Sequence, residues 1–401
     1  MEATVLTERG RRNLAILDTI RRAGAISRAE ISRSLRLNVV TISNYIDEFL
    51  RQNIVLERDL DVSGGGRRPV LLGINPDVGL AVGVGLNLLN TVATTVNIKG
   101  EMVGRVKTEN NNNVRDIVDS ILDLIQRSID NIEQKDKIKG IGVGIAGVID
   151  KEKDIVRWPQ KIGDGCHYAT ISLPLKSIIE KRFGLPCLIE NDATLACFGE
   201  QWLSLGPEAK NVLFLFSGVG CGIIINGEIY RGATGCAGEI SISSRYEAEG
   251  DFSCQVGNPC FVKRWEADLG IVSQARQNLK DGMPSIMSQK SDSLDILTLN
   301  DVFDAARKND NLAMELLKSA GRRLGIKAAY LVNIFNPRVL IVGGGIEEDS
   351  GILVDAVRQG VADWAFEEMV RAVKIIPSTL GENAVALGAA NLVIRQMFTE
   401  A

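Results

Sequence analysis

The sequence predicts an α/β protein in which a small winged helix-turn-helix head precedes two related lobes. A capped helix pair followed by two strands accounts for the head. A strand-turn-strand pattern that occurs twice, with helical segments between, accounts for the lobes. At 401 residues the chain is also too long for one ordinary core. We expect the head at residues 1–75, the first lobe at 78–200 and the second at 201–384, with a C-terminal helix over 385–401 packing back on the first lobe.

Composition places the chain among ordinary globular proteins, with 45% apolar and 24% charged residues. The net charge of -4 is uneven, because residues 1–70 hold 12 arginines, no lysine and 9 acidic residues. A basic head on an acidic body favours nucleic-acid contact by the head. No signal peptide or apolar run of about 20 residues occurs. The seven cysteines, an odd number in a chain without a secretory signal, argue against a disulfide framework and indicate a reducing cytosol. We therefore expect a cytoplasmic protein without a membrane segment.

The head begins with an amphipathic helix over 11–22. Ser27 and Glu30 form a capping box that opens a short second helix, and a tight turn over 36–38 leads to a third helix over 39–52. In a helix-turn-helix the N-terminal part of the third helix meets base edges in the major groove. The short polar side chains there, which could contact bases or phosphates or instead be caps and solvated surface, are Asn38, Thr41, Ser43 and Asn44.

A wing is predicted behind these helices. Strands over 54–57 and 70–72 flank a Gly-Gly-Gly-Arg-Arg-Pro loop, whose Arg67 and Arg68 suit a narrow minor groove or phosphates. The alternative is that this loop is a flexible interdomain linker.

The body starts the same pattern twice. Strands over 80–84 and 91–97, with a third from 102, correspond to strands over 212–216 and 222–225 and a third through 231. An Asn-Gly turn at 226–227 is a strong hairpin signal. Helical segments are expected at 114–132, 173–183 and 311–329. Two related lobes of this kind enclose a cleft in which nucleotides or sugars commonly bind.

Motifs along the body are similar to those of the ROK family, which comprises repressors, open reading frames and sugar kinases. The matching stretches lie at 142–147, 185–193, 217–240 and 336–345, and include Gly-Cys-Ala-Gly-Glu-Ile at 235–240. The head resembles that of the family's xylose- and N-acetylglucosamine-type repressors, including the Gly-Gly-Arg-Arg-Pro wing. The resemblance implies a two-lobed fold of the actin-like (ribonuclease H-like) ATPase class behind a winged helix-turn-helix.

This resemblance places Asp192 at the position of the kinase general base, and Asn191, Asp192 and Glu239 among the sugar ligands. Taken alone, an Asp at a strand end is more often a helix cap. The first phosphate loop of family kinases has an acid and a Thr, whereas this chain has Gly85 and Leu89 there. Losing charge neutralisation removes most of the rate of phosphoryl transfer, so we expect no kinase activity. The second hairpin, Ser217 to Gly222, is equally well explained as a turn.

The zinc site of the family is degenerate in this sequence. Ile242 stands at the histidine position, Val262 at that of a later Glu, and only Cys254 and Cys260 remain of the cysteine cluster. Two thiols do not complete a tetrahedral site, so we expect no zinc cofactor or at most a two-cysteine remnant. A disulfide between them is disfavoured in the cytosol.

Two other residues are open to more than one interpretation. Trp158 could stack on a sugar or belong to the core, and His167, the one histidine, is expected in a surface loop rather than as a polar contact. With fewer family ligands present, the effector is a sugar or polyol held differently from glucose, or the site is vestigial.

The leading hypothesis is a homodimeric or tetrameric repressor that reads operator DNA and responds to a small carbohydrate. The rivals are an active sugar kinase with a regulatory DNA-binding head, and a regulator controlled by a protein partner.

Overall fold

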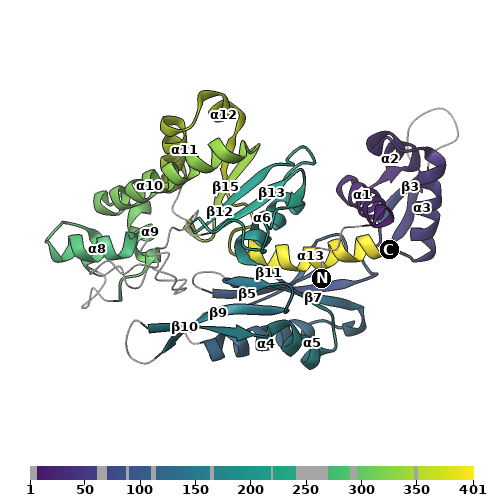
Figure 1. Cartoon of the computed structure of the whole chain (residues 1–401), viewed down its shortest axis with the longest axis horizontal. Coiled ribbons are helices and arrows are strands. Elements are labelled where there is room, and N and C mark those ends of the chain that lie inside the picture. The colour runs from purple at the N-terminus through teal and green to yellow at the C-terminus, as the bar shows by residue number, and fades with distance from the viewer. Residues whose placement is uncertain are drawn as a thin grey trace.

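The computed structural model describes residues 7–60, 70–86, 90–109, 114–162, 167–217, 220–240, 270–289, 296–346 and 351–401. A small head lies beside two five-stranded sheets (Figure 1). The C-terminal helix α13 (Ala384–Glu400), yellow in Figure 1, runs from between the two sheets to the head. Within the described ranges no helix is long and apolar enough to cross a bilayer.

The head has the winged helix-turn-helix arrangement that the sequence predicts. The capping box is present: the Ser27 N–H donates to Glu30 Oε2 at 2.9 Å, and the Glu30 N–H donates to Ser27 Oγ at 3.3 Å. The strand order is β1-β3-β2. The elements are α1 (Glu8–Ala23), β1 (Ile26–Ser27), α2 (Arg28–Leu35), α3 (Val39–Arg51), β2 (Val55–Leu60) and β3 (Val70–Ile74).

The loop between β2 and β3 is not an interdomain linker, because the two strands that it joins pair with each other. They are antiparallel, with Leu60 opposite Val70. Arg67 and Arg68 themselves lie outside the described residues. The covalent link between head and body is residues 75–79, a short segment between β3 and the first strand of the body.

The two central sheets share one topology, which confirms the predicted duplication. Their strand orders are β6-β5-β4-β7-β11 and β14-β13-β12-β15-β16. In each, three antiparallel strands are followed by two parallel ones. The strands of the first sheet are β4 (Leu80–Leu86), β5 (Asn90–Asn97), β6 (Met102–Glu109), β7 (Ile138–Ile145) and β11 (Cys187–Asn191); those of the second are β12 (Val212–Phe216), β13 (Gly220–Ile225), β14 (Glu228–Ile229), β15 (Val339–Gly343) and β16 (Lys374–Pro377).

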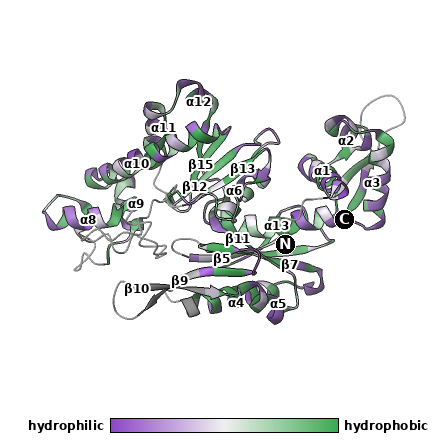
Figure 2. Ribbon diagram, in the orientation of Figure 1, coloured by the Kyte–Doolittle hydropathy of each residue, from purple (hydrophilic) through white to green (hydrophobic). Residues whose placement is uncertain are grey.

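The helices expected from periodicity are present, and the last of the three extends further than predicted. It continues to an Asn336 cap with a φ of 42°. Figure 2 shows mostly hydrophobic strands in both sheets and hydrophilic residues on the outer helices. The remaining helices are α4 (Val114–Asp130), α5 (Leu175–Phe183), α6 (Asp192–Leu203), α8 (Ile271–Lys280), α9 (Leu299–Arg307), α10 (Asn311–Phe335), α11 (Ile352–Trp364) and α12 (Glu367–Ala372), with 3-10 turns η1 (Lys135–Lys137), η3 (Ile286–Gln289) and η6 (Gly381–Asn383).

A third, smaller antiparallel sheet lies beside the first lobe. It consists of β8 (Val148–Asp150), β9 (Ile155–Ile162) and β10 (His167–Leu173). His167 therefore begins a strand, opposite Ile162, and the expectation of a surface loop was wrong. Trp158 lies in β9 opposite Ile171. The side chains of Trp158 and His167 are not among the described ones, so their roles stay open.

Helix α13 lies directly on the first sheet, backbone against backbone. A Cβ atom built on Gly83 of β4 would lie 2.0 Å from the carbonyl oxygen of Ala386, and one on Gly142 of β7 would lie 2.1 Å from that of Ala389. Only glycine permits such an approach. The glycines of these strands therefore fix how closely α13 packs.

Candidate functional site

The candidate effector site lies where β11 ends and α6 begins. Asn191 is the N-cap of α6, and its Oδ1 accepts the N–H of Thr194 at 3.1 Å. Asp192 is the first residue of the helix. The sequence alone would suggest Asp192 as the helix cap, but the residue that caps α6 is Asn191. The Asp192 side chain is therefore not the N-cap of α6.

The Asp192 carboxyl is buried and only partly hydrogen bonded. Asp192 is 4% exposed, and its Oδ1 accepts a hydrogen bond from the Ala193 N–H at 2.8 Å. Oδ2 is buried with no hydrogen-bond partner among the described residues. Burial raises the pKa of Asp192 to about 7; the hydrogen bond from the Ala193 N–H opposes this shift, and the nearby negative charge of Glu239 adds to it. A buried polar atom without a partner is costly, so this oxygen is suited to a ligand hydroxyl.

Glu239 is held at this site by backbone pairing within the second lobe. It forms a bridge with Gly220 at the start of β13, and the adjacent Cys221 N–H donates to the Gly238 carbonyl at 2.8 Å. Gly238 has a φ of +96°, and a Cβ there would lie 1.9 Å from the Cys221 oxygen, so only glycine fits. Asn191, Asp192 and Glu239 are therefore gathered where the two lobes meet; their contacts with a sugar remain a prediction.

An ion-pair cluster beside the site was not predicted from the sequence. Glu190, 1% exposed, receives Arg231 Nε at 2.7 Å and Lys151 Nζ at 3.1 Å. Although burial opposes ionisation, the two cations lower the pKa of Glu190. Lys151 follows β8 and Arg231 follows β14, so one carboxylate holds groups from both lobes. The signal for this cluster in the sequence was a charged residue, Glu190, near the end of the short strand β11.

The candidate DNA-binding face is the exposed beginning of α3. Asn38 is exposed and caps the helix, with its Oδ1 accepting the Val40 N–H at 2.8 Å. Asn44 is exposed, whereas Thr41 and Ser43 are half-buried. Val40 is 67% exposed, as an apolar contact for a thymine methyl requires. Asn38 thus has a structural role as well, and base contacts by the four polar residues remain a prediction.

In both regions that correspond to the phosphate loops of family kinases, the described residues make close contacts with other parts of the protein. A Cβ on Gly85 would lie 2.6 Å from the backbone nitrogen of Ala386, so an acidic side chain there would displace α13. Ser217 is fully buried, and its hydroxyl donates to the Gly344 carbonyl at 2.6 Å. Residues 87–89 and 218–219 lie outside the described residues.

Comparison with known sequences identifies the family. A sequence model of the ROK family matches residues 80–396. The chain belongs to the ROK family. Its fold is that of a ROK protein, a two-lobed α/β domain of the actin-like ATPase class, as predicted.

Individual ROK relatives include both regulators and enzymes. The xylose repressor of Caldicellulosiruptor bescii is 29% identical over 392 residues, which cover 96% of each chain. A glucokinase of Halalkalibacterium halodurans is 30% identical over 266 residues, 66% of this chain and 78% of that enzyme. The crystal structure of a ROK family transcriptional regulator, a homologue of the E. coli MLC protein, has a TM-score of 0.75 at 22% identity, covering 98% of this chain and 97% of that one.

The residues that bear on the ROK zinc site lie outside the described ranges. They are Ile242, Cys254, Cys260 and Val262. In the part of the chain that the structure describes, no group of three or more His, Cys, Asp or Glu side chains is arranged to hold a metal ion. The expectation of no zinc therefore stays a prediction.

Proposed function

We propose that this ROK protein is a cytoplasmic transcriptional regulator, acting as a repressor of carbohydrate-utilisation genes. The observation that carries the proposal is a winged head whose α3 begins with exposed polar and apolar residues, on a chain similar over its whole length to a xylose repressor. The match to the glucokinase covers 66% of this chain. A head of this kind has no use in phosphoryl transfer.

Selection of duplexes from a random library tests this function. The full-length protein is expected to enrich a pseudo-palindromic sequence whose halves match two recognition helices. Binding of the selected duplex must persist in the presence of excess competitor DNA. Equal binding of all duplexes would contradict the proposal.

The effector proposed for the cleft is a neutral sugar or polyol held by Asn191, Asp192 and Glu239. The Asp192 oxygen that has no partner in the described part of the chain supports it, because a ligand hydroxyl can supply a hydrogen bond there. Thermal-shift screening with D-xylose, hexoses, N-acetylhexosamines, polyols and their phosphates is the direct measurement, since a ligand of the folded state raises the Tm. If operator affinity ignored all of them, pull-down of a protein partner would become the relevant test.

Kinase activity is proposed to be absent. Gly85 leaves no side chain for a metal or phosphate, and the backbone of α13 fills the space beside it. An ATP-consumption assay over the same sugars is expected to show no turnover above background. Clear turnover would establish the rival function, a sugar kinase with a regulatory head.

Two substitutions in the head are expected to affect DNA binding differently. Asn44→Ala should change base preference at one position of each half-site, by about 1–3 kcal/mol of discrimination. Arg68→Ala should weaken binding to all sequences and lower its salt dependence. Titrations of selected and scrambled duplexes at several salt concentrations measure both effects. Equal losses on all sequences from both variants would contradict these roles.

We propose that the regulator is a homodimer, because reading a pseudo-palindrome requires two heads. Ile326, Tyr330 and Ile334 form an exposed apolar row along α10, 48%, 69% and 55% exposed. Phe366, 68% exposed, adjoins this row, since its N–H donates to Asn333 Oδ1 at 3.0 Å. A second copy of the chain would bury such a row against its own counterpart.

Light scattering is expected to give the mass of a dimer for the wild type and of a monomer for Tyr330→Lys. The control is Val103→Lys, which changes another exposed apolar residue, on β6. A tetramer would require an additional interface, and an unchanged mass in Tyr330→Lys would place the interface elsewhere.

A further inference from the structure

Helix α6 connects the candidate effector site to the head. Its N-terminal end holds Asn191 and Asp192, and its last turn lies against α1 of the head. Twelve helical residues span about 18 Å. One straight element therefore reaches from the lobe junction to the DNA-binding domain.

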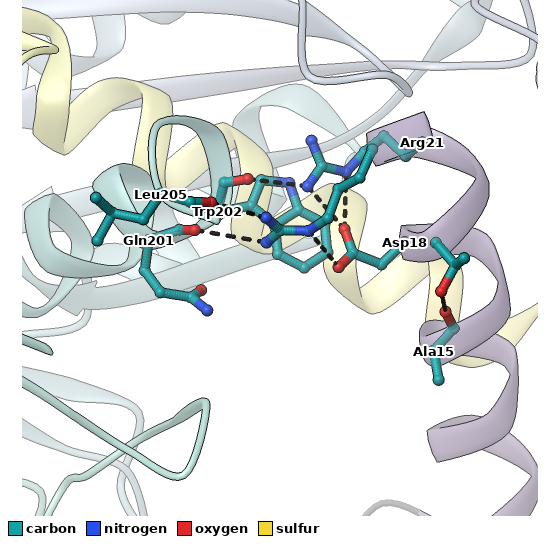
Figure 3. A network of polar contacts seen from close by, with 8 residues as sticks. Ala15, Asp18, Arg21, Gln201, Trp202 and Leu205 are labelled. Carbon is teal, nitrogen blue, oxygen red and sulfur yellow. Dashed lines mark hydrogen bonds and ion pairs between the residues drawn. The ribbon is translucent and has the colours of Figure 1, made fainter. Parts of the chain in front are cut away.

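The last carbonyl groups of α6 have no partners within the helix and accept hydrogen bonds from the head instead. Arg21 Nη2 donates to the Trp202 carbonyl at 2.9 Å, and Arg22 Nη2 lies 3.5 Å from that of Gln201. Arg22 Nη1 donates to the carbonyl of Leu205, just beyond the helix, at 2.9 Å (Figure 3). Two cations at a helix C-terminus also meet the negative end of its dipole.

Asp18 holds the two arginines in this geometry. Its Oδ1 accepts from Arg21 at 2.7 Å and its Oδ2 from Arg22 at 2.8 Å. The Arg21 guanidinium lies 4.4 Å from the centre of the Trp202 ring, and its side chain is 7% exposed. Burial, the largest influence, lowers the pKa of Arg21, although Asp18 acts in the opposite direction. A buried, paired and stacked arginine fixes an orientation that a surface ion pair does not.

Apolar packing continues across the same contact. Ile16, Leu17 and Ile20 of α1 belong to one buried cluster with Trp202 of α6 and Phe398 of α13. The Trp202 ring centre lies 6.4 Å from that of Phe398. The head thus shares a hydrophobic core with the first lobe, and this packing holds it in place.

Helix α6 also cannot slide freely against its neighbours in the body. A Cβ on Gly388 of α13 would lie 2.0 Å from the Leu195 carbonyl oxygen, and one on Gly222 of β13 would lie 2.2 Å from that of Ala193. Close backbone contacts at both faces mean that a shift of the second lobe carries α6 with it.

We infer that α6 transmits the state of the effector site to the DNA-binding head through the docking of Arg21 and Arg22 on its C-terminal end. The inference rests on the proposed function and specifies how its two sites are coupled. Arg21 and Arg22 are positioning residues: their contacts with Asp18 and with the end of α6 set the orientation of α1.

A double-mutant cycle tests the coupling and requires no effector to be added. Asp192→Asn, a change of charge and hydrogen bonding at one end of α6, is expected to alter affinity for the selected duplex at pH 8 by at least about fivefold. In an Arg21→Ala/Arg22→Ala background the same change should alter affinity by less than about twofold, as for independent sites. Fluorescence anisotropy with the full-length protein gives both factors.

Matched variants separate docking from other effects. Among the residues that the structure describes, Arg12 of the same helix forms its ion pair with Glu8, on the exposed face, so Arg12→Ala should leave the fivefold factor intact. If the double alanine variant does not fold, Arg21→Lys/Arg22→Lys retains both charges but lacks the bidentate and stacking geometry, and should still reduce the factor.

The outcomes are distinguishable. Absence of an Asp192→Asn effect in the wild-type background, or an equal effect in both backgrounds, would overturn this inference alone. A wild-type protein that prefers no duplex would instead refute the proposed function.

Discussion

Replacement of Gly83 with alanine is expected to lower the free energy of unfolding by at least about 3 kcal/mol, because the new methyl group meets backbone rather than a movable side chain. Its Cβ would lie 2.0 Å from the Ala386 oxygen and 2.5 Å from the Ala390 nitrogen. Helix α13 must then move away from β4. Since α13 also contacts α6 and α1, the loss should extend to the docking of the head.

Urea unfolding followed by circular dichroism measures this loss, with limited proteolysis reporting on the head. Gly104→Ala is the matched control, because it changes a glycine of the same sheet whose added Cβ would have its nearest contacts at 3.7 Å. That variant should differ from the wild type by well under about 1 kcal/mol. Equal stability of the two variants would contradict the close packing of α13.

Substitution of Asp192 by asparagine is expected to make the protein more stable at pH 8 and to remove a pH dependence. The folded-state pKa of about 7 lies above the usual value of 3.8, so the folded protein binds the proton more tightly than the unfolded chain. The stabilisation that protonated Asp192 contributes to the folded state is fully present below about pH 4 and is lost as the pH rises through about 7. The shift corresponds to about 4 kcal/mol, in order of magnitude.

Thermal unfolding of the wild type and Asp192→Asn between pH 4 and pH 8 tests this expectation. The Tm of the variant should exceed that of the wild type increasingly as the pH rises through this window. Asp123→Asn provides the control, because it makes the same substitution at a carboxylate that is 60% exposed on α4. A constant difference for Asp192→Asn would mean that its carboxyl is not buried in the folded protein.

Local signals made much of the fold predictable. The capping box at Ser27 and the Asn226-Gly227 turn, whose φ angles of 54° and 84° suit only small or turn-forming residues, act over a few residues and appear directly in the sequence. Repetition of the hairpin pattern then predicted two lobes. Asn191, Asp192 and Glu239 were found through family motifs, and the structure brings them together.

Contacts between distant segments were not predictable in this way. Nothing near Arg21 in the sequence indicates Trp202, and nothing near Glu190 indicates Lys151 or Arg231; these pairs exist because the tertiary fold brings separate elements together. The pairing of β9 with β10 was not predicted, and the only residue of it that was assigned a place, His167, was expected in a surface loop. Pro159 in β9 is a residue type that is rare within strands, so the sequence carried little strand signal there.

The short connection between head and body has a consequence for target choice. Residues 75–79 form a short linker, and α1 shares a hydrophobic core with the first lobe. The body therefore fixes the orientation of α3. Two such heads in the proposed dimer would present one separation and angle to the double helix in each effector state. The number of base pairs between half-sites would then be discriminated as strictly as the bases themselves.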